Sequence, residues 1–145
     1  PFNRGKHYNF WSLVEQCPFG VSLHIVEEGI DSGPVISQSS IPYTWEDTGE
    51  TLFYKAIKAM KTLVIETYPI IRTLNFPIKT QDLSLGSYHS SSEIEKKSFI
   101  DLDKKIRPRD LFNLLRARTF PGLPSCTFRG DDGVIYEIRV HISKE

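Results

Sequence analysis

An acidic loop with two glycines is the segment of this sequence best suited to chemistry. It reads Glu27-Glu28-Gly29-Ile30-Asp31-Ser32-Gly33 and joins two apolar runs. Asp31 lies between the glycines, where backbone can approach a ligand closely and a carboxylate can be held rigidly. On the local sequence alone, a turn that Asp31 closes through its own side chain is the alternative, because Asp-Ser-Gly is common turn chemistry.

Two further polar features could assist such a site. His24 lies on the apolar run before the loop, although a lone strand histidine is more often a structural residue. The segment Asn3-Arg4-Gly5-Lys6-His7 carries positive charge, which suits a carboxylate or phosphate and equally suits a solvated loop. The sequence has no glycine-rich phosphate cradle, zinc-ligand spacing or nucleophile elbow, which argues against a nucleotide hydrolase, a metalloenzyme and a serine hydrolase.

The residue patterns around these groups predict strands and helices of an α/β protein. Alternating apolar residues predict strands over residues 21–26 and 34–41, on either side of the acidic loop. Helical spacing predicts a short helix over residues 9–15 and a long helix over residues 51–68, capped by Asp47 or Thr48 and ended or kinked by Pro69. The stripe of the long helix expected to face the core is Phe53, Ile57, Met60 and Val64.

The second half of the chain reads as a connection followed by a small lobe. Residues 82–97 are rich in serine and charge and predict an exposed linker. A helix after Pro108 is expected to turn Leu111, Phe112, Leu114 and Leu115 inward. The turn at residues 130–133 predicts a β-hairpin between residues 126–129 and 134–142. These patterns divide the chain into residues 1–81, a linker over 82–97, and a C-terminal lobe over 98–145.

Composition limits the protein classes that the chain can belong to. A chain of 145 residues, 39% of them hydrophobic, can form one core with a small appendage. Lysine and arginine equal aspartate and glutamate at 18 each, so the basic excess that favours nucleic-acid binding is absent. Without an apolar run of membrane-spanning length or a leader, a cytoplasmic protein with no membrane contact is expected. Cys17 and Cys126 fit no metal-ligand spacing, so we expect ordinary thiols and no metal.

Four segments, taken in order, resemble a known family: PFNRGKHYNFW, GVSLHIVEEGIDSGPVISQ, TGETLFYKA and then Gln81. They resemble the 10-formyltetrahydrofolate-dependent formyltransferases, as does the later segment IDLDKKIRPRDLFNLLRARTFPG. The resemblance implies the C-terminal portion of a Rossmann-like domain, followed by a small α+β lobe that ends in a hairpin. It also implies transfer of a formyl group from 10-formyltetrahydrofolate to an amine.

The resemblance assigns roles to individual residues. Asp31 matches the catalytic aspartate of the family, and His24 matches a histidine often seen near it. The resemblance implies folate contacts from Glu28, Gly29, Ile30 and Asp31, and substrate contacts from Arg4, Gly5 and Lys6. The other catalytic residues of the family, an asparagine and a histidine separated by one residue, would precede Pro1. Since Pro1 to Gly5 reads as the middle of a loop, we expect further chain there, and we expect residues 1–145 alone to be inactive.

The acceptor amine is expected to belong to a nucleotide-linked sugar. The first segment lacks the Arg-Gly-Ala-Ala-Pro pattern of methionyl-tRNA formyltransferases, and the region beyond the linker is too short and too neutral for their basic C-terminal barrel. Glycinamide ribonucleotide formyltransferases normally lack a segment resembling residues 99–124. A methionyl-tRNA formyltransferase fragment, or a non-catalytic remnant serving as a binding or dimerisation module, is the alternative. Strands missing from the sheet would expose apolar edges, which favour a homodimer.

Overall fold

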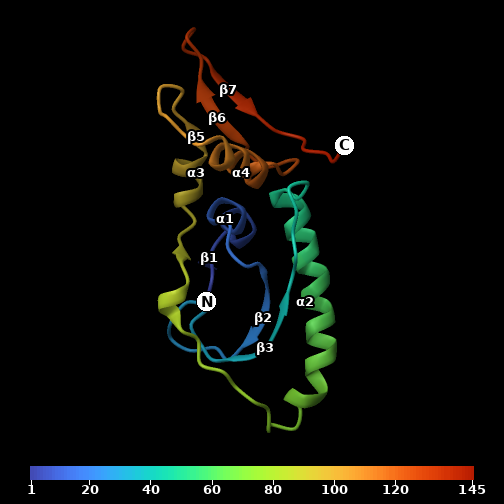
Figure 1. Ribbon diagram of the computed structural model, residues 1–145. Helices are drawn as coiled ribbons and strands as arrows, with labels where there is room; N and C mark the ends of the chain where they lie inside the picture. Colours follow the sequence, from blue (N-terminus) through green and yellow to red (C-terminus); the bar gives the residue numbers. More distant parts are fainter.

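The computed structural model describes residues 1–145 as a mixed α/β arrangement (Figure 1). The first half comprises β1 (Arg4–Gly5), α1 (Tyr8–Glu15), β2 (Gly20–His24), β3 (Val35–Ser40) and α2 (Gly49–Ile71). The second half comprises η1 (Leu83–Leu85), β4 (Tyr88–His89), α3 (Glu93–Ser98), β5 (Phe99–Ile100), α4 (Pro108–Arg118), β6 (Cys126–Arg129) and β7 (Ile135–Ile138). None of the helices is long and apolar enough to cross a membrane.

The strands form three small sheets. β2 and β3 form an antiparallel ribbon, with the acidic loop at the end where β2 stops and β3 starts. β1 pairs in parallel with β4, so the beginning of the chain meets a segment from its middle. β5, β6 and β7 form the third sheet, in which β6 and β7 are the predicted hairpin, projecting from one end of the molecule in Figure 1. The strand and hairpin predictions are confirmed, although β2 and β7 end earlier than expected.

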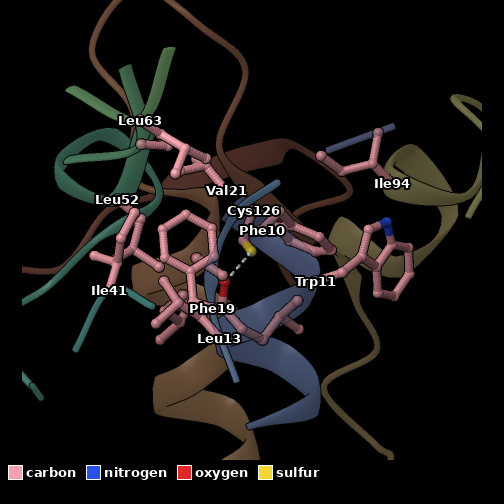
Figure 2. Close-up of a cluster of buried hydrophobic side chains, with 14 residues drawn as sticks. Phe10, Trp11, Leu13, Phe19, Val21, Ile41, Leu52, Leu63, Ile94 and Cys126 are labelled. Atoms are coloured by element: carbon pink, nitrogen blue, oxygen red, sulfur yellow. Dashed lines mark hydrogen bonds between the residues drawn. The ribbon is translucent and has the colours of Figure 1, made fainter. Parts of the chain in front are cut away.

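A single apolar core joins the two halves of the chain. Fourteen buried residues form one cluster, which Figure 2 shows with α1 at its centre. Phe10 of α1 packs edge to face on Trp11, with ring centroids 5.0 Å apart. Cys126 of β6 belongs to the same cluster, and burial raises the pKa of its thiol to about 12. Residues more than 110 positions apart therefore share one region from which water is excluded.

The long helix α2 begins at the predicted cap. The Thr48 hydroxyl accepts the Thr51 backbone N–H at 3.3 Å, and the Thr51 hydroxyl accepts the Thr48 N–H at 2.9 Å. This reciprocal pair satisfies two amides that the first turn leaves free. Pro69 lies in the last turn, and the helix ends two residues later, at Ile71. The helix tolerates Pro69 there because a proline so near the end removes only one backbone hydrogen bond.

The predicted inward stripe of α2 is wrong for two of its four residues. Met60 is 41% exposed and Val64 is 42% exposed, whereas Leu52, Ala56 and Leu63 are buried. Apolar residues occur nearly all around this helix, so periodicity alone did not distinguish the two faces. The small side chain of Ala56 allows α2 to approach the β2–β3 ribbon on the face that is buried.

In α4, the inward orientation expected for Phe112 is also wrong. Phe112 is 48% exposed, while Leu114 and Leu115 are buried. The inward face of α4 instead includes the buried guanidinium of Arg116, which donates to the Asn113 side chain at 2.9 Å and to the Asp47 carbonyl at 3.2 Å. The bond to Asp47 fixes α4 to the loop before α2.

Residues 82–97 are more structured than the predicted exposed linker. They contain η1, β4 and most of α3, and His89 and Ile94 within them are buried. Serine and charged residues hid this order, because their side chains here bond to one another instead of facing only solvent. From the end of α2 the segment runs along the side of the molecule that faces away from α2. There its strand β4 lies next to β1 (Figure 1).

The two faces of α2 can be distinguished by substitution. We expect Leu52→Ala to lower the free energy of unfolding by about 2–5 kcal/mol, because it leaves a cavity in the core. Met60→Ala, on the exposed face, should change it by less than about 0.5 kcal/mol. Urea denaturation followed by circular dichroism measures both. Equal losses for the two variants would contradict the placement of α2.

Candidate functional site

The Asp31 carboxylate lies between a backbone amide and an imidazole. Its Oδ2 accepts the Gly5 N–H at 3.0 Å, and its Oδ1 lies 3.7 Å from His24 Nε2. The other ring nitrogen, His24 Nδ1, is 2.9 Å from the Ile25 carbonyl, to which it can only donate. The structure thus brings together three residues that the sequence analysis names: Asp31 and His24 from one segment of the chain and Gly5 from another.

Gly5 makes this arrangement possible because it has no side chain. Its φ is +94°, and a Cβ atom there would lie 2.4 Å from the His89 carbonyl oxygen. That oxygen accepts the N–H of Lys6 at 3.0 Å. A larger residue would strain the backbone and push β1 away from β4, which would move the amide that holds Asp31.

The remaining predicted site residues lie around this centre. Glu28, Gly29 and Ile30 are exposed on the same loop as Asp31, within reach of a ligand from solvent. Lys6 is exposed beside Gly5, and Arg4 is half-buried on β1 with an Nε that has no hydrogen-bond partner. Their positions allow contact with a ligand.

A cavity of about 430 Å³ opens next to the turn that carries Gly5. The aromatic rings of Tyr8, Phe53 and Phe120 line it, together with His7 and Arg118. His7 follows Gly5 by two residues, which span at most about 7 Å. The cavity therefore begins within a short distance of the turn whose Gly5 amide binds the Asp31 carboxylate.

The polar side of this cavity is a nearly buried cation. Arg118 is 7% exposed and donates through Nη2 to Glu95 at 2.6 Å, while its Nε has no partner. Burial and, after it, the charge of Arg118 lower the pKa of His7. Aromatic faces beside a guanidinium suit a flat ring attached to an anionic group.

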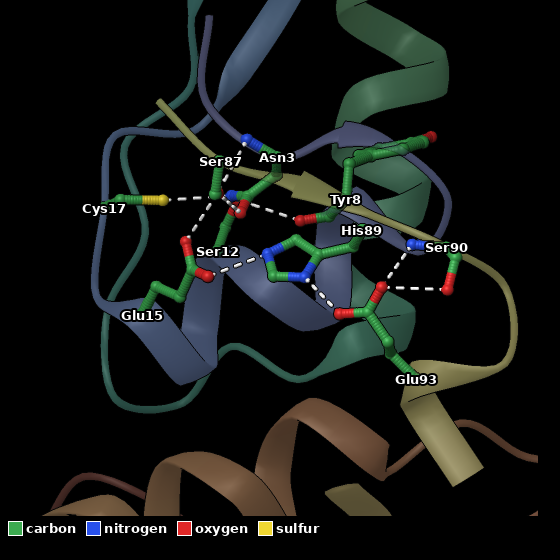
Figure 3. Close-up of polar contacts among 9 residues, drawn as sticks. All are labelled: Asn3, Tyr8, Ser12, Glu15, Cys17, Ser87, His89, Ser90 and Glu93. Atoms are coloured by element: carbon green, nitrogen blue, oxygen red, sulfur yellow. Dashed lines mark hydrogen bonds and ion pairs between the residues drawn. The ribbon is translucent and has the colours of Figure 1, made fainter. Parts of the chain in front are cut away.

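A polar cluster beside β4 holds the Gly5 turn in place. Figure 3 shows the His89 imidazole between two carboxylates, with Nε2 2.7 Å from Glu15 and Nδ1 3.1 Å from Glu93. The ring also stacks on Trp11 at a centroid distance of 3.7 Å and an interplanar angle of 8°. Ser87 adds a hydrogen bond to Glu15 at 2.8 Å. These contacts fasten β4 to α1, and β4 in turn fixes β1.

Sequence reasoning missed the cavity and the cluster. Tyr8, Phe53, Arg118 and Phe120 are spread over more than 110 residues and form no local motif. His89 lies in the serine-rich segment whose composition predicts a linker. The burial of Arg118 at the end of α4 marks it as unusual, but burial is a property of the fold. The spacing of residues in the sequence does not show it.

Comparison with known proteins gives consistent matches. Residues 93–144 match the family model described as the N-formyltransferase dimerization C-terminal domain. Over 145 residues, the sequence is 23% identical to the dTDP-4-amino-4,6-dideoxyglucose formyltransferase of Mycobacterium tuberculosis, with 100% of this chain and 62% of that protein covered. The crystal structure of a 4-N formyltransferase from Francisella tularensis superposes with a TM-score of 0.93 at 25% identity, covering 100% of this chain and 60% of that one.

A further solved structure includes ligands. The formyltransferase PseJ from Anoxybacillus kamchatkensis, in complex with UDP-4,6-dideoxy-4-formamido-L-AltNAc and tetrahydrofolate, superposes with a TM-score of 0.63 at 33% identity. The match covers 66% of this chain and 50% of that one.

The fold is a mixed α/β arrangement that matches the C-terminal part of formyltransferases. The chain is similar to N-formyltransferases, which confirms the resemblance seen in its sequence. It spans 62% of the length of the curated relatives that it matches.

The polar cluster predicts an acid-sensitive fold. The Ser90 backbone N–H, the His89 ring and the Ser90 hydroxyl, in that order of effect, lower the pKa of Glu93 from 4.5 to about 2. Because the folded-state pKa is depressed, the ionised carboxylate stabilises the fold above about pH 4.5, and this contribution is lost as the pH falls toward 2. Urea midpoints should therefore fall over this range, and fall less in Glu93→Gln.

Glu66→Gln on α2 is the control for this experiment, because Glu66 is exposed and makes no hydrogen bond. It should keep the pH dependence of the parent chain. If Glu93→Gln also keeps the full dependence, Glu93 does not contribute to acid sensitivity.

Proposed function

We propose that this chain is part of an N-formyltransferase that moves a formyl group from 10-formyltetrahydrofolate to the amine of a nucleotide-linked amino sugar. The observation that carries the proposal is the Asp31 carboxylate, held by the Gly5 amide beside the His24 ring, in a chain related over its whole length to sugar formyltransferases. The acceptor class follows from the relative that acts on a dTDP-linked amino sugar and from the formamido-sugar bound to PseJ.

The proposed reaction is attack of the sugar amine on the formyl carbon. A new C–N bond forms, a tetrahedral oxyanion develops, and the bond to the folate nitrogen then breaks. The amine must lose a proton, and the folate nitrogen must gain one. Ionised Asp31 is an acceptor and can orient a neighbouring imidazole and assist the removal of the amine proton. The oxyanion needs donors, which the asparagine and histidine expected before Pro1 would supply.

The two substrates are assigned to different parts of the candidate site. The exposed backbone of Glu28, Gly29 and Ile30 would contact the folate. Arg4 and Lys6, on the turn at Gly5, would contact the anionic part of the sugar nucleotide. The aromatic cavity beside His7 has a volume typical of ligand pockets and could accept the base.

We further propose a division of labour along the chain. Residues 1–81 would complete a Rossmann-like catalytic domain, residues 82–97 would connect it to the rest, and residues 98–145 would form the C-terminal lobe. On this proposal residues 1–145 alone have negligible activity, because the oxyanion donors are missing. The even charge balance disfavours a methionyl-tRNA formyltransferase fragment as the alternative.

Replacing Asp31 tests the proposed chemistry. In the natural protein that contains residues 1–145 and the expected upstream strand, Asp31→Asn should lower kcat by roughly 10²–10⁴-fold, because it removes the proton acceptor and keeps the shape. The assay follows formylation of dTDP-4-amino-4,6-dideoxyglucose by 10-formyltetrahydrofolate. Asp103→Asn, at an exposed residue whose carboxylate makes no hydrogen bond, is the control and should retain parent activity. Parent-like turnover by Asp31→Asn would remove Asp31 from the mechanism.

We propose that the chain also forms a homodimer through residues 93–144, the part that matches a dimerization domain. The projecting hairpin exposes Val134, Ile135 and Tyr136, an apolar strip that a second copy could cover.

Sedimentation analysis tests this proposal. The parent chain should sediment as a dimer, and Ile135→Glu should be monomeric because a charge cannot be buried unpaired at the interface. Ile65→Glu is the matched control: Ile65 is 73% exposed on α2, outside the dimerization domain, and this variant should remain dimeric. A monomeric parent, or dissociation by Ile65→Glu alone, would contradict the proposed interface.

A further inference from the structure

The acidic loop is bound by a segment about 50 residues further along the chain. Val35, the first residue of β3, forms an isolated antiparallel bridge with Lys79, in which each backbone N–H donates to the other residue's carbonyl at 2.8 Å. This bridge places the residues after Lys79 directly beside the loop. Gln81 is the half-buried residue that follows, and its side chain points into the loop's backbone.

The amide of Gln81 satisfies two carbonyl groups of the loop. Its Nε2 donates to the Asp31 carbonyl at 3.0 Å and to the Gly33 carbonyl at 2.6 Å. A primary amide nitrogen carries two hydrogens, so one group can make both bonds. The loop is thus fixed through its backbone at Asp31 and again two residues later.

The backbone of Asp31 needs such support. Its φ is +51°, in the left-handed region that residues with side chains seldom adopt. In this conformation the carbonyl faces Gln81 while the carboxylate faces Gly5 and His24. The next restraint is at Gly33, which approaches Ile25 so closely that a Cβ would lie 1.8 Å from the Ile25 oxygen. Loss of the bonds at Asp31 would let its backbone leave this conformation and carry the carboxylate away.

We infer that Gln81 is a positioning residue that holds the Asp31 carboxylate against the Gly5 amide through two hydrogen bonds to the loop backbone. The hydrogen bonds of Gln81 go to the loop backbone and not to the carboxylate, so Gln81 acts through the backbone of Asp31. The consequence for catalysis rests on the proposed function, whereas the structural role of Gln81 does not.

The structural role is tested in residues 1–145 by NMR. A carboxylate that accepts an amide N–H shifts that amide's resonance as it ionises, so the Gly5 amide should move with pH in the parent chain. Gln81→Met keeps the length of the side chain and removes both donors. Its Gly5 amide should lose most of the pH-dependent shift. The control Gln38→Ala removes a glutamine that donates to Ser22 on the same ribbon, away from Asp31, and should leave the shift unchanged.

A parent-like Gly5 shift in Gln81→Met would overturn the inference. Gln81→Ala is the second variant, because it removes both donors without adding a methionine side chain. It should lose the pH-dependent Gly5 shift to the same extent. Circular dichroism of each variant confirms that the chain is folded, and a folded variant of either kind that retains the shift is sufficient to reject the positioning role.

The catalytic consequence is measured in the natural longer protein by a double-mutant cycle. Gln81→Met should lower kcat roughly tenfold, with KM for the sugar nucleotide little changed, because misplacing a reacting group costs rate more than binding. In the Asp31→Asn background Gln81→Met should have no further effect, since it acts only through Asp31. Independent, multiplying losses would overturn the inference. If the parent protein transfers no formyl group, the proposed function fails, and the NMR result still decides the role of Gln81.

Discussion

The absence of a side chain at Gly5 is the constraint on which the candidate site depends. Three segments meet at this residue: β1 itself, β4 through the close approach of the His89 carbonyl, and the acidic loop through the Asp31 carboxylate. Neither β1 nor β4 is long enough to hold its position alone, since each has two residues. The site is therefore a junction, and its geometry is set by packing between segments rather than by any one element.

The surrounding structure supports this junction from both sides. On one side His89 is stacked on Trp11 and bonded to Glu15 and Glu93, which ties β4 to the core helix α1. On the other side the loop is bound by the segment at Lys79 and Gln81. Polar contacts thus support the junction, while the apolar cluster around Phe10 and Leu13 stabilises the fold as a whole.

The sequence was sufficient to predict the elements that have a local cause. The cap at Thr48, the alternating apolar residues of β2 and β3, and the turn at residues 130–133 each depend on neighbouring residues, and each was found where expected. Asp31 and His24 were singled out from one short stretch and lie together. The exposed face of α2, the order in residues 82–97 and the cavity at Arg118 depend on residues far apart in sequence, and no spacing rule contains that information.

The pairing of β1 with β4 has a consequence for synthesis on the ribosome. Gly5 is made 84 residues before its partner His89, so a nascent chain cannot complete the junction until both residues have emerged. Cys126, which completes the core beside Phe10, emerges later still. During this interval the acidic loop and the aromatic face of α1 lack their native covers. The growing chain is then most exposed to wrong pairing and most dependent on chaperones.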